Sequence, residues 1–207
     1  SIDVGSESSG KDRKLVLKVQ LAIAANAVVG ITGKNGYRLK VESASSEAGS
    51  AFVPTTASID VMRLVAKGNF KLDGSSTGNT LGTFDGCNLE KQGTGTWTIT
   101  GDNSKQAGFV AVHAGTLCVG KGASIGTGQT SLDGGAVLQL ADGASIGAPF
   151  VRDGVVIDMT DGVIGKSICT GPFTGPNGGT VTFKFDLSKD GVDHFVMNGA
   201  GPTNSIK

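Results

Sequence analysis

Two segments of nearly the same sequence begin 21 positions apart in this chain. GTLCVGKGASIG runs over residues 115–126, and AVLQLADGASIG runs over residues 136–147. The pattern extends upstream to GTWTIT at 95–100 and downstream to VIDMTDG at 156–162, with shifts of 20 and 19 residues. Self-similarity at a period of about 20 residues indicates a repeat architecture, in which each unit stacks on the one before it.

Each copy of the repeat contains a short segment in which apolar and polar residues alternate. Alternation with a period of two is typical of a strand with one buried face. The residues expected inside are Trp97, Ile99, Leu117, Val119, Leu138, Leu140, Ile157 and Met159. The residues expected outside are Thr98, Cys118, Gln139 and Asp158.

A turn rich in Gly, Asp or Asn follows each alternating segment, where Gly permits a positive φ. A second short segment then ends at Ile125, Ile146 or Ile164. Helical periodicity and the LxxLxLxxN pattern of leucine-rich repeats are both missing from the repeat region. We therefore predict an all-β fold, a right-handed parallel β-helix (solenoid) with coils of about 20 residues. Coils of this length would number on the order of ten and span roughly 50 Å.

Three regions follow from the repeat boundaries. Residues 1–85 are expected to form irregular N-terminal coils with a candidate cap, residues 86–166 the regular β-helix repeats, and residues 167–207 terminal coils with a β-hairpin. In the first region Leu15–Ile23 alternates, which predicts a strand that either caps the solenoid or pairs with another chain's open edge. An Ala-rich amphipathic helix over Gln20–Val29 is the alternative for the second half of that stretch.

Composition limits the classes of partner. The chain has 18 Lys and Arg against 18 Asp and Glu, with no basic run, so it lacks the electrostatic footprint of a nucleic-acid-binding protein. No apolar run approaches the ~18 residues that span a bilayer, so we expect no membrane insertion of this fragment. With no net charge to keep copies apart, self-association is favoured over what a strongly charged chain would show.

The three cysteines form no CxxC pair. Cys118 belongs to the outward set, and the separations of Cys87, Cys118 and Cys169 are not whole multiples of a 20-residue coil. The three are not expected to stack, and Cα separations beyond about 7 Å forbid a bridge. We predict no intramolecular disulfide.

The stretch from Leu89 to Ser124 resembles the passenger-associated strand repeat of bacterial autotransporters. The residues that carry the resemblance are Leu89, Lys91, Gly93, Gly95, Trp97, Ile99, Gly101, Asn103, Gly108, Gly115, Thr116 and Leu117. Two positions depart from that repeat: the tyrosine usual after the Asn is replaced within SKQ at 104–106, and Gly-Thr-Thr reads Gly108-Phe109-Val110. Residues 178–201 are similar to the segment near the end of many passengers.

This resemblance implies a β-helix at the bacterial cell surface or outside the cell, usually adhesive or a scaffold. The strand edges of a solenoid's terminal coils and the lack of net charge lead us to expect copies of the chain or further coils of the parent protein as partners. Host or environmental glycans or proteins are the other candidate partners.

Several sequence patterns resemble catalytic or binding sites, but a structural role explains each of them better. GVIGKS at 162–167 has Thr160 where a phosphate loop needs Gly, so we discard it. His113 and His194 are interpreted as an outward strand residue and a hairpin residue, since no nucleophile-elbow pattern surrounds any Ser. Lys121, Asp142 and Asp161 fall in one column, where turn chemistry explains them better than a polysaccharide-cleaving or calcium site.

The stretch Asp186–His194 partly mimics a calcium loop. Its twelfth position is Met197, which cannot ligate calcium, and a hairpin around Asp190-Gly191 explains the same residues. The sequence thus assigns no catalytic, cofactor-binding or metal-binding residue and implies no cofactor. The leading hypothesis is a non-enzymatic surface-exposed or secreted bacterial β-helix that acts in adhesion or in surface or filament assembly. The alternative is a polysaccharide-active β-helix enzyme.

Overall fold

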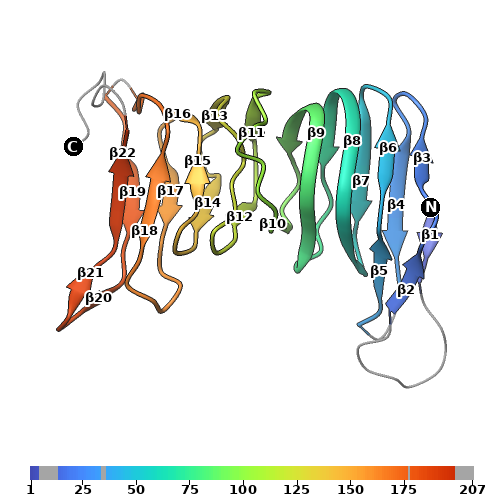
Figure 1. Ribbon diagram of the computed structural model, residues 1–207, viewed down its shortest axis with the longest axis horizontal. Helices are drawn as coiled ribbons and strands as arrows, with labels where there is room; N and C mark the ends of the chain where they lie inside the picture. The colour runs from blue at the N-terminus through green and yellow to red at the C-terminus, as the bar shows by residue number, and fades with distance from the viewer. Residues whose placement is uncertain (5–13, 34–35, 177, 199–207) are drawn as a thin grey trace.

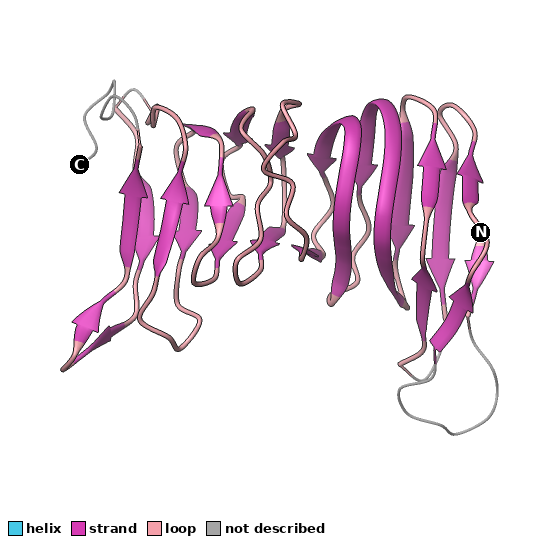
Figure 2. Cartoon of the chain, viewed as in Figure 1, coloured by secondary structure: helices cyan, strands magenta, loops and turns pink. Residues whose placement is uncertain are grey.

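The computed structural model describes residues 1–4, 14–33, 36–176 and 178–198. These residues wind into a parallel β-solenoid of about 8 turns with about 20 residues per turn. The coils stack along the long axis of the molecule, with the N-terminal and C-terminal coils at opposite ends (Figure 1). The described residues form strands and loops alone (Figure 2). The predicted all-β solenoid is therefore confirmed.

Each coil passes through three sheet faces. The first face is formed by β2 (Lys14–Leu17), β5 (Arg38–Val41), the beginnings of β8 (Ser58–Leu72) and β9 (Asn79–Lys91), β10 (Thr96–Ile99), β12 (Thr116–Val119), β14 (Val137–Leu140), β17 (Val155–Asp158) and β19 (Val181–Lys184). The second face is formed by β3 (Leu21–Ile23), β6 (Ala44–Ser46), the middles of β8 and β9, β15 (Ser145–Ile146), β18 (Lys166–Cys169) and β22 (His194–Met197).

The third face is formed by β1 (Ile2–Asp3), β4 (Val28–Thr32), β7 (Ser50–Pro54), the ends of β8 and β9, β11 (Val110–Val112), β13 (Gln129–Leu132) and β16 (Ala148–Val151). An antiparallel hairpin of β20 (Leu187–Ser188) and β21 (Gly191–Val192) projects from the last coil (Figure 1). The pairing between coils is parallel throughout the described residues, so side chains of one type form columns along the axis.

The register predicted from the repeats is confirmed. Trp97 pairs with Leu117 and Leu117 with Leu138, which reproduces the shifts read from the sequence. All eight residues expected inside are buried, and each contributes roughly 1.5–3 kcal/mol by leaving water. Asp158 lies in the outward column as predicted but is 9% exposed, because Thr160 donates to its carboxylate and Lys184 lies 3.4 Å away.

Three details differ from the sequence-based expectation. The solenoid has about 8 turns rather than ten, because the end coils are longer: Lys14 pairs with Arg38, and Asp158 with Lys184. Ile164 is exposed, since a loop displaces it and Cys169 takes the place over Ile146.

The third difference concerns the alternating stretch Leu15–Ile23. It forms two strands, β2 and β3, rather than one, because the chain turns a corner between two faces at residues 18–20 and leaves Val19 72% exposed. Strands β3 and β4 occupy the stretch Gln20–Val29 for which an amphipathic helix was the alternative.

Candidate functional site

The passenger-type repeat begins at the end of β9, where Lys91 is wholly buried. Lys91 occupies an interior column between Leu72 and Val112. Its ammonium donates to three backbone carbonyl oxygens, at 2.6 Å (Gln92), 2.9 Å (Gly93) and 3.0 Å (Ala114). Burial lowers the pKa of Lys91 to about 8, and the Asp73 carboxylate acts in the opposite direction. Lys91 therefore fastens its own turn to the next coil.

The turn beside Lys91 requires glycine. Gly115 has a φ of 68°, and a Cβ there would lie 2.5 Å from the carbonyl oxygen of Gly93 and 2.8 Å from Lys91 Nζ. A Cβ at Gly95 would meet the carbonyl oxygen of Ser76 in the preceding coil. These glycines let two turns approach closely enough for one lysine to bind carbonyls of both.

Trp97 fills the corner above this turn. Its indole is wholly buried, and Nε1 donates to the carbonyl oxygen of Asp73 at 3.1 Å. The ring stacks on Phe52 at 6.5 Å, and Phe52 contacts Phe70 edge to face at 5.1 Å. Trp97 thus belongs to one apolar cluster that joins three coils, and its Nε1 has a hydrogen-bond partner although it is buried.

Asn103 is the second buried polar residue of the repeat. Its Nδ2 donates to the carbonyl oxygens of Gly82, Gly101 and Ser124 at 3.3, 3.1 and 2.9 Å. Its Oδ1 accepts the backbone N–H of Phe84 at 2.7 Å. The partners belong to three successive coils, so this one side chain fixes their spacing.

Within the SKQ stretch at 104–106, where the repeat departs from its usual tyrosine, Gln106 makes a similar link. Its side-chain Nε2 donates to the backbone carbonyl oxygen of Cys87 at 2.7 Å, and its backbone carbonyl oxygen accepts the N–H of Thr127 at 2.8 Å. Lys91, Asn103 and Gln106 therefore act as braces between coils. The sequence motif named the first two without indicating that they are buried.

The column of Lys121, Asp142 and Asp161 is present as predicted. Lys121 lies 3.4 Å from Asp142, and Asp161 accepts the backbone N–H of Asp142 at 3.0 Å. Each carboxylate also accepts a further backbone N–H, from Lys166 and Val163 respectively. The arrangement is that of turn residues.

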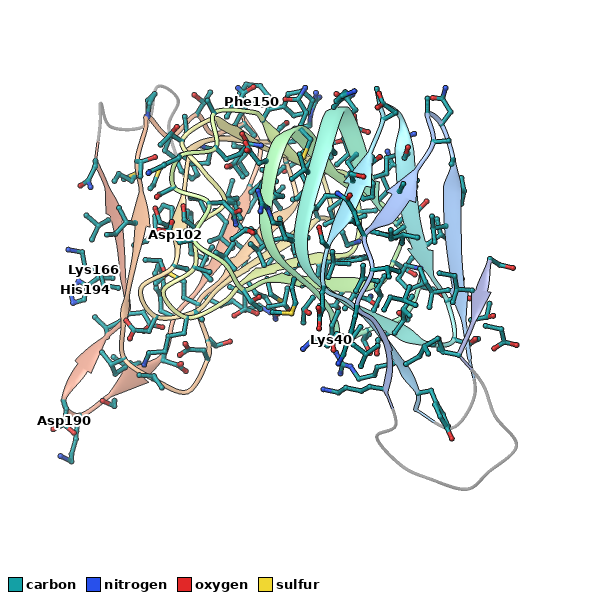
Figure 3. The ribbon with its side chains drawn as sticks, turned by 45° about the vertical axis from the view of Figure 1, so that its right-hand side comes forward. Lys40, Asp102, Phe150, Lys166, Asp190 and His194 are labelled. Atoms are coloured by element: carbon teal, nitrogen blue, oxygen red, sulfur yellow. The ribbon has the colours of Figure 1, made fainter. Side chains whose placement is uncertain are left out.

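The two histidines lie on different faces. His113 follows β11, is exposed, and its Nδ1 lies 2.7 Å from Asp133, which also pairs with Arg152 at 2.9 Å. This His–Asp–Arg row was missed, although each residue directly follows a buried strand end. His194 is the first residue of β22 rather than part of the hairpin, and it lies beside Lys166 (Figure 3).

The predicted hairpin around Asp190-Gly191 is confirmed, with Asp190 at its tip (Figure 3). Asp193 is buried at its base and accepts the N–H of Gly165 and of Asp186 at 2.8 and 2.6 Å. Within the described residues, no group of three or more His, Cys, Asp or Glu side chains is placed to hold a metal ion.

All three cysteines are free, as predicted. Cys87 and Cys169 are buried, whereas Cys118 is partly exposed on the first face and donates to Gln139 Oε1 at 2.7 Å. Burial and the Asp85 carboxylate raise the pKa of Cys87 to about 12.

The third face carries an exposed aromatic ring. Phe150 on β16 is 37% exposed and borders a shallow hollow together with Arg152, Asp153 and Pro176. Phe150 lies at the outer edge of the molecule (Figure 3). An exposed ring beside a guanidinium is suited to contact with a ligand that has both apolar and polar groups.

Residues 89–119 match the model of the passenger-associated-transport-repeat family. No curated protein and no solved structure gives a significant match. In the part of the chain that the structure describes, no helix has the length and apolarity needed to cross a membrane.

Fold and repeat together define the class of the chain, a parallel β-solenoid braced by a passenger-type repeat. The transport repeat at residues 89–119, built into this solenoid, supports an autotransporter passenger β-helix, as the sequence resemblance implied.

Proposed function

We propose that the chain is a surface-exposed or secreted bacterial β-helix that acts in adhesion or in surface assembly, without enzymatic turnover. The passenger-type repeat at 89–119, built into a continuous solenoid, is the observation that carries this proposal. Passengers of this kind lie outside the cell, so the outer faces of the coils are the surfaces that meet a partner.

The interior supports a mechanical role. Lys91 and Asn103 tie neighbouring coils together through buried hydrogen bonds, and the parallel ladders run from coil to coil. A rod braced in this way keeps its outer columns in fixed register. Binding energy is then gained over a long, preorganised face rather than inside a pocket.

The hollow beside Phe150 is the contact surface we favour for an environmental partner. An aromatic ring packs against the C–H face of a sugar, and Arg152 and Asp153 supply polar atoms to its hydroxyl groups. Host or environmental glycans fit this chemistry, and copies of the chain are the second proposed partner.

A glycan array probed with the purified chain tests the proposal. We expect retention of a subset of glycans, weakened at least about tenfold by Phe150→Ala. Met62→Ala is the matched control, since it removes an exposed apolar side chain from β8. Release of new reducing ends from a bound polysaccharide would contradict the non-enzymatic proposal and favour the polysaccharide-active alternative.

A further inference from the structure

On the third face, side chains that can bond to sugar hydroxyl groups recur once in each coil. His113, Asp133 and Arg152 directly follow β11, β13 and β16, whose last residues pair in register. They therefore form one column along the axis, at the strand spacing of about 4.8 Å. Gln92 follows β9 and continues this column into the preceding coil. Four successive coils thus present a hydrogen-bonding side chain at the same place.

Contacts within the column hold its side chains in place. Asp133 Oδ2 lies 2.7 Å from Nδ1 of His113, and Asp133 Oδ1 lies 2.9 Å from Nε of Arg152. The carboxylate of one coil is therefore fixed by the coils on both sides of it. The side chains of His113 and Arg152 remain 42% and 63% exposed, so both still reach solvent. Side chains ordered in advance lose less entropy when a ligand binds.

Beside this column lie two aromatic rings two coils apart. Phe109 directly precedes β11, alternates with the buried Val110, and is partly exposed. Phe150 is the exposed ring of β16, in register with Ser131 and through it with Ala111. Ser131 therefore lies in the coil between the two rings. This surface, the platform, runs from Phe109 to Phe150 along the polar column.

The spacing of the platform fits a linear polysaccharide. Neighbouring strands are about 4.8 Å apart, and each residue of an extended chain of β-1,4-linked hexoses advances by nearly the same length. A chain laid along the solenoid axis therefore places one sugar on each coil. Phe109 and Phe150 then stack on two sugars with one sugar between them, and the polar column bonds to hydroxyl groups along the chain.

The charges of the platform favour a neutral chain. Carboxylates lie in or beside it on Glu90, Asp133 and Asp153, and cationic side chains on Lys71 and Arg152. A polyuronate would bring one further carboxylate with each sugar to a surface that has no excess of positive charge. Hydroxyl groups of a neutral sugar can instead donate to the carboxylates and accept from the guanidinium.

We propose that the third face binds one linear neutral polysaccharide chain along the solenoid axis, with sugars on Phe109 and Phe150. This inference rests on the proposed adhesive role and specifies the class of ligand and its direction. The coils of β11, β13 and β16 each hold one sugar, and the column from His113 to Arg152 lies along one side of the chain.

Titration calorimetry with oligosaccharides of defined length tests this geometry. The probes are cellohexaose, chitohexaose and mannohexaose, their disaccharides, and hexagalacturonate as the acidic chain. At least one neutral hexamer should bind, and its disaccharide at least about tenfold more weakly, because two sugars cannot reach both rings. Hexagalacturonate should bind more weakly than that hexamer.

Two variants address the length dependence. Phe109→Ala removes one ring, and Ser131→Trp places a bulky side chain between the rings. Each should reduce the advantage of the hexamer over the disaccharide by at least about tenfold. Met62→Ala is the control away from the third face, and thermal unfolding shows whether each variant keeps its fold. Since Ser131 is a partly exposed residue of the outer surface, Ser131→Trp tests the path of the chain even if Phe109→Ala fails to fold.

The outcomes separate this inference from the proposed function. Equal binding of hexamer and disaccharide to wild type would overturn a chain along the axis and leave adhesion at Phe150 in place. Tighter binding of hexagalacturonate than of every neutral hexamer would overturn the neutral class. Binding of no hexamer would overturn the inference. The adhesive role would then stand if the glycan array retained other glycans and fall if it retained none.

Discussion

The ammonium of Lys91 lies 3.0 Å from the carbonyl oxygen of Ala114, a residue of the following coil. A lysine in a column of Leu and Val is costly to bury, so its presence needs a compensating interaction. The three carbonyl oxygens around it provide that compensation by accepting hydrogen bonds from its ammonium. Lys91 and the carbonyls therefore form one unit that holds the repeat closed.

Replacement of Lys91 by Met should destabilise the fold. Three partly buried carbonyl oxygens lose their donor, which we expect to lower the free energy of unfolding by about 1–3 kcal/mol. Equilibrium urea unfolding measures this change, with Lys71→Met on the neighbouring coil as the control because Lys71 faces outward. Equal or greater stability of Lys91→Met would show that the carbonyls need no cation.

The stability of the wild type should depend on pH above neutrality. The pKa of Lys91 is lowered from 10.5 to about 8 in the folded chain, so between these values the unfolded chain binds more protons. The free energy of unfolding contributed by this group therefore rises as pH increases from about 8 to 10.5. Urea titrations across this range should show a rise in wild type relative to Lys91→Met. A difference between the two proteins that stays flat would contradict the lowered pKa.

Asn103 should tolerate neither Ala nor Asp. Alanine removes four hydrogen bonds that join three coils, and we expect a loss of about 2–4 kcal/mol. Aspartate keeps the shape but points a carboxylate oxygen at three carbonyls, so it should destabilise at least as much at neutral pH. Thermal unfolding compares both with Ser104→Ala, which changes an exposed neighbour. If Asp were tolerated and Ala were not, shape rather than hydrogen bonding would explain the position.

Alanine substitutions at two glycines distinguish the stability lost through backbone strain from the stability lost through steric contact of the new Cβ. Gly115 and Gly122 have φ values of 68° and 66°, but a Cβ at Gly122 meets nothing within 4 Å. Gly122→Ala should cost about 1–2 kcal/mol for its left-handed backbone alone. Gly115→Ala should cost clearly more, since its Cβ would strike the carbonyl oxygen of Gly93. Similar losses in urea unfolding would mean that the turns are free to separate.

The repeat made the register predictable. Once Leu117 and Leu138 were aligned, period-two alternation decided which residues face inward, and the strand pairing follows that alignment. Turn residues such as Asp142 were also predictable, because Asp and Gly mark the corners of each coil. These features depend on local pattern and repeat length, which the sequence displays directly.

Other features depend on contacts between coils that the alternation does not encode. Lys91 is the last residue of β9, and the approach of Gly115 from the next coil helps to enclose it. Asp158 was expected outside and is largely covered, because a lysine 26 residues away folds over it. The loop that displaces Ile164 makes its coil longer than the repeat, so an alignment with a fixed repeat length places Ile164 wrongly.

Thiol reactivity should follow burial in the folded chain. Cys118 is partly exposed, whereas Cys87 and Cys169 are buried. Burial raises the pKa of all three thiols, so accessibility rather than ionisation separates them. Maleimide at pH 8 should therefore label Cys118 first, and the other two only after unfolding. Peptide mass spectrometry assigns the labelled positions. Labelling of Cys87 in the native chain would contradict the interior assigned to β9.

Labelling of intact cells with a membrane-impermeant maleimide tests the proposed surface role most directly. In the cells that produce the chain, Cys118 should be labelled without lysis, and Cys118→Ser should abolish the signal because the other two thiols are buried. Labelling of Cys118 that appears only after the cells are broken would contradict the account, since it would place the solenoid inside the cell.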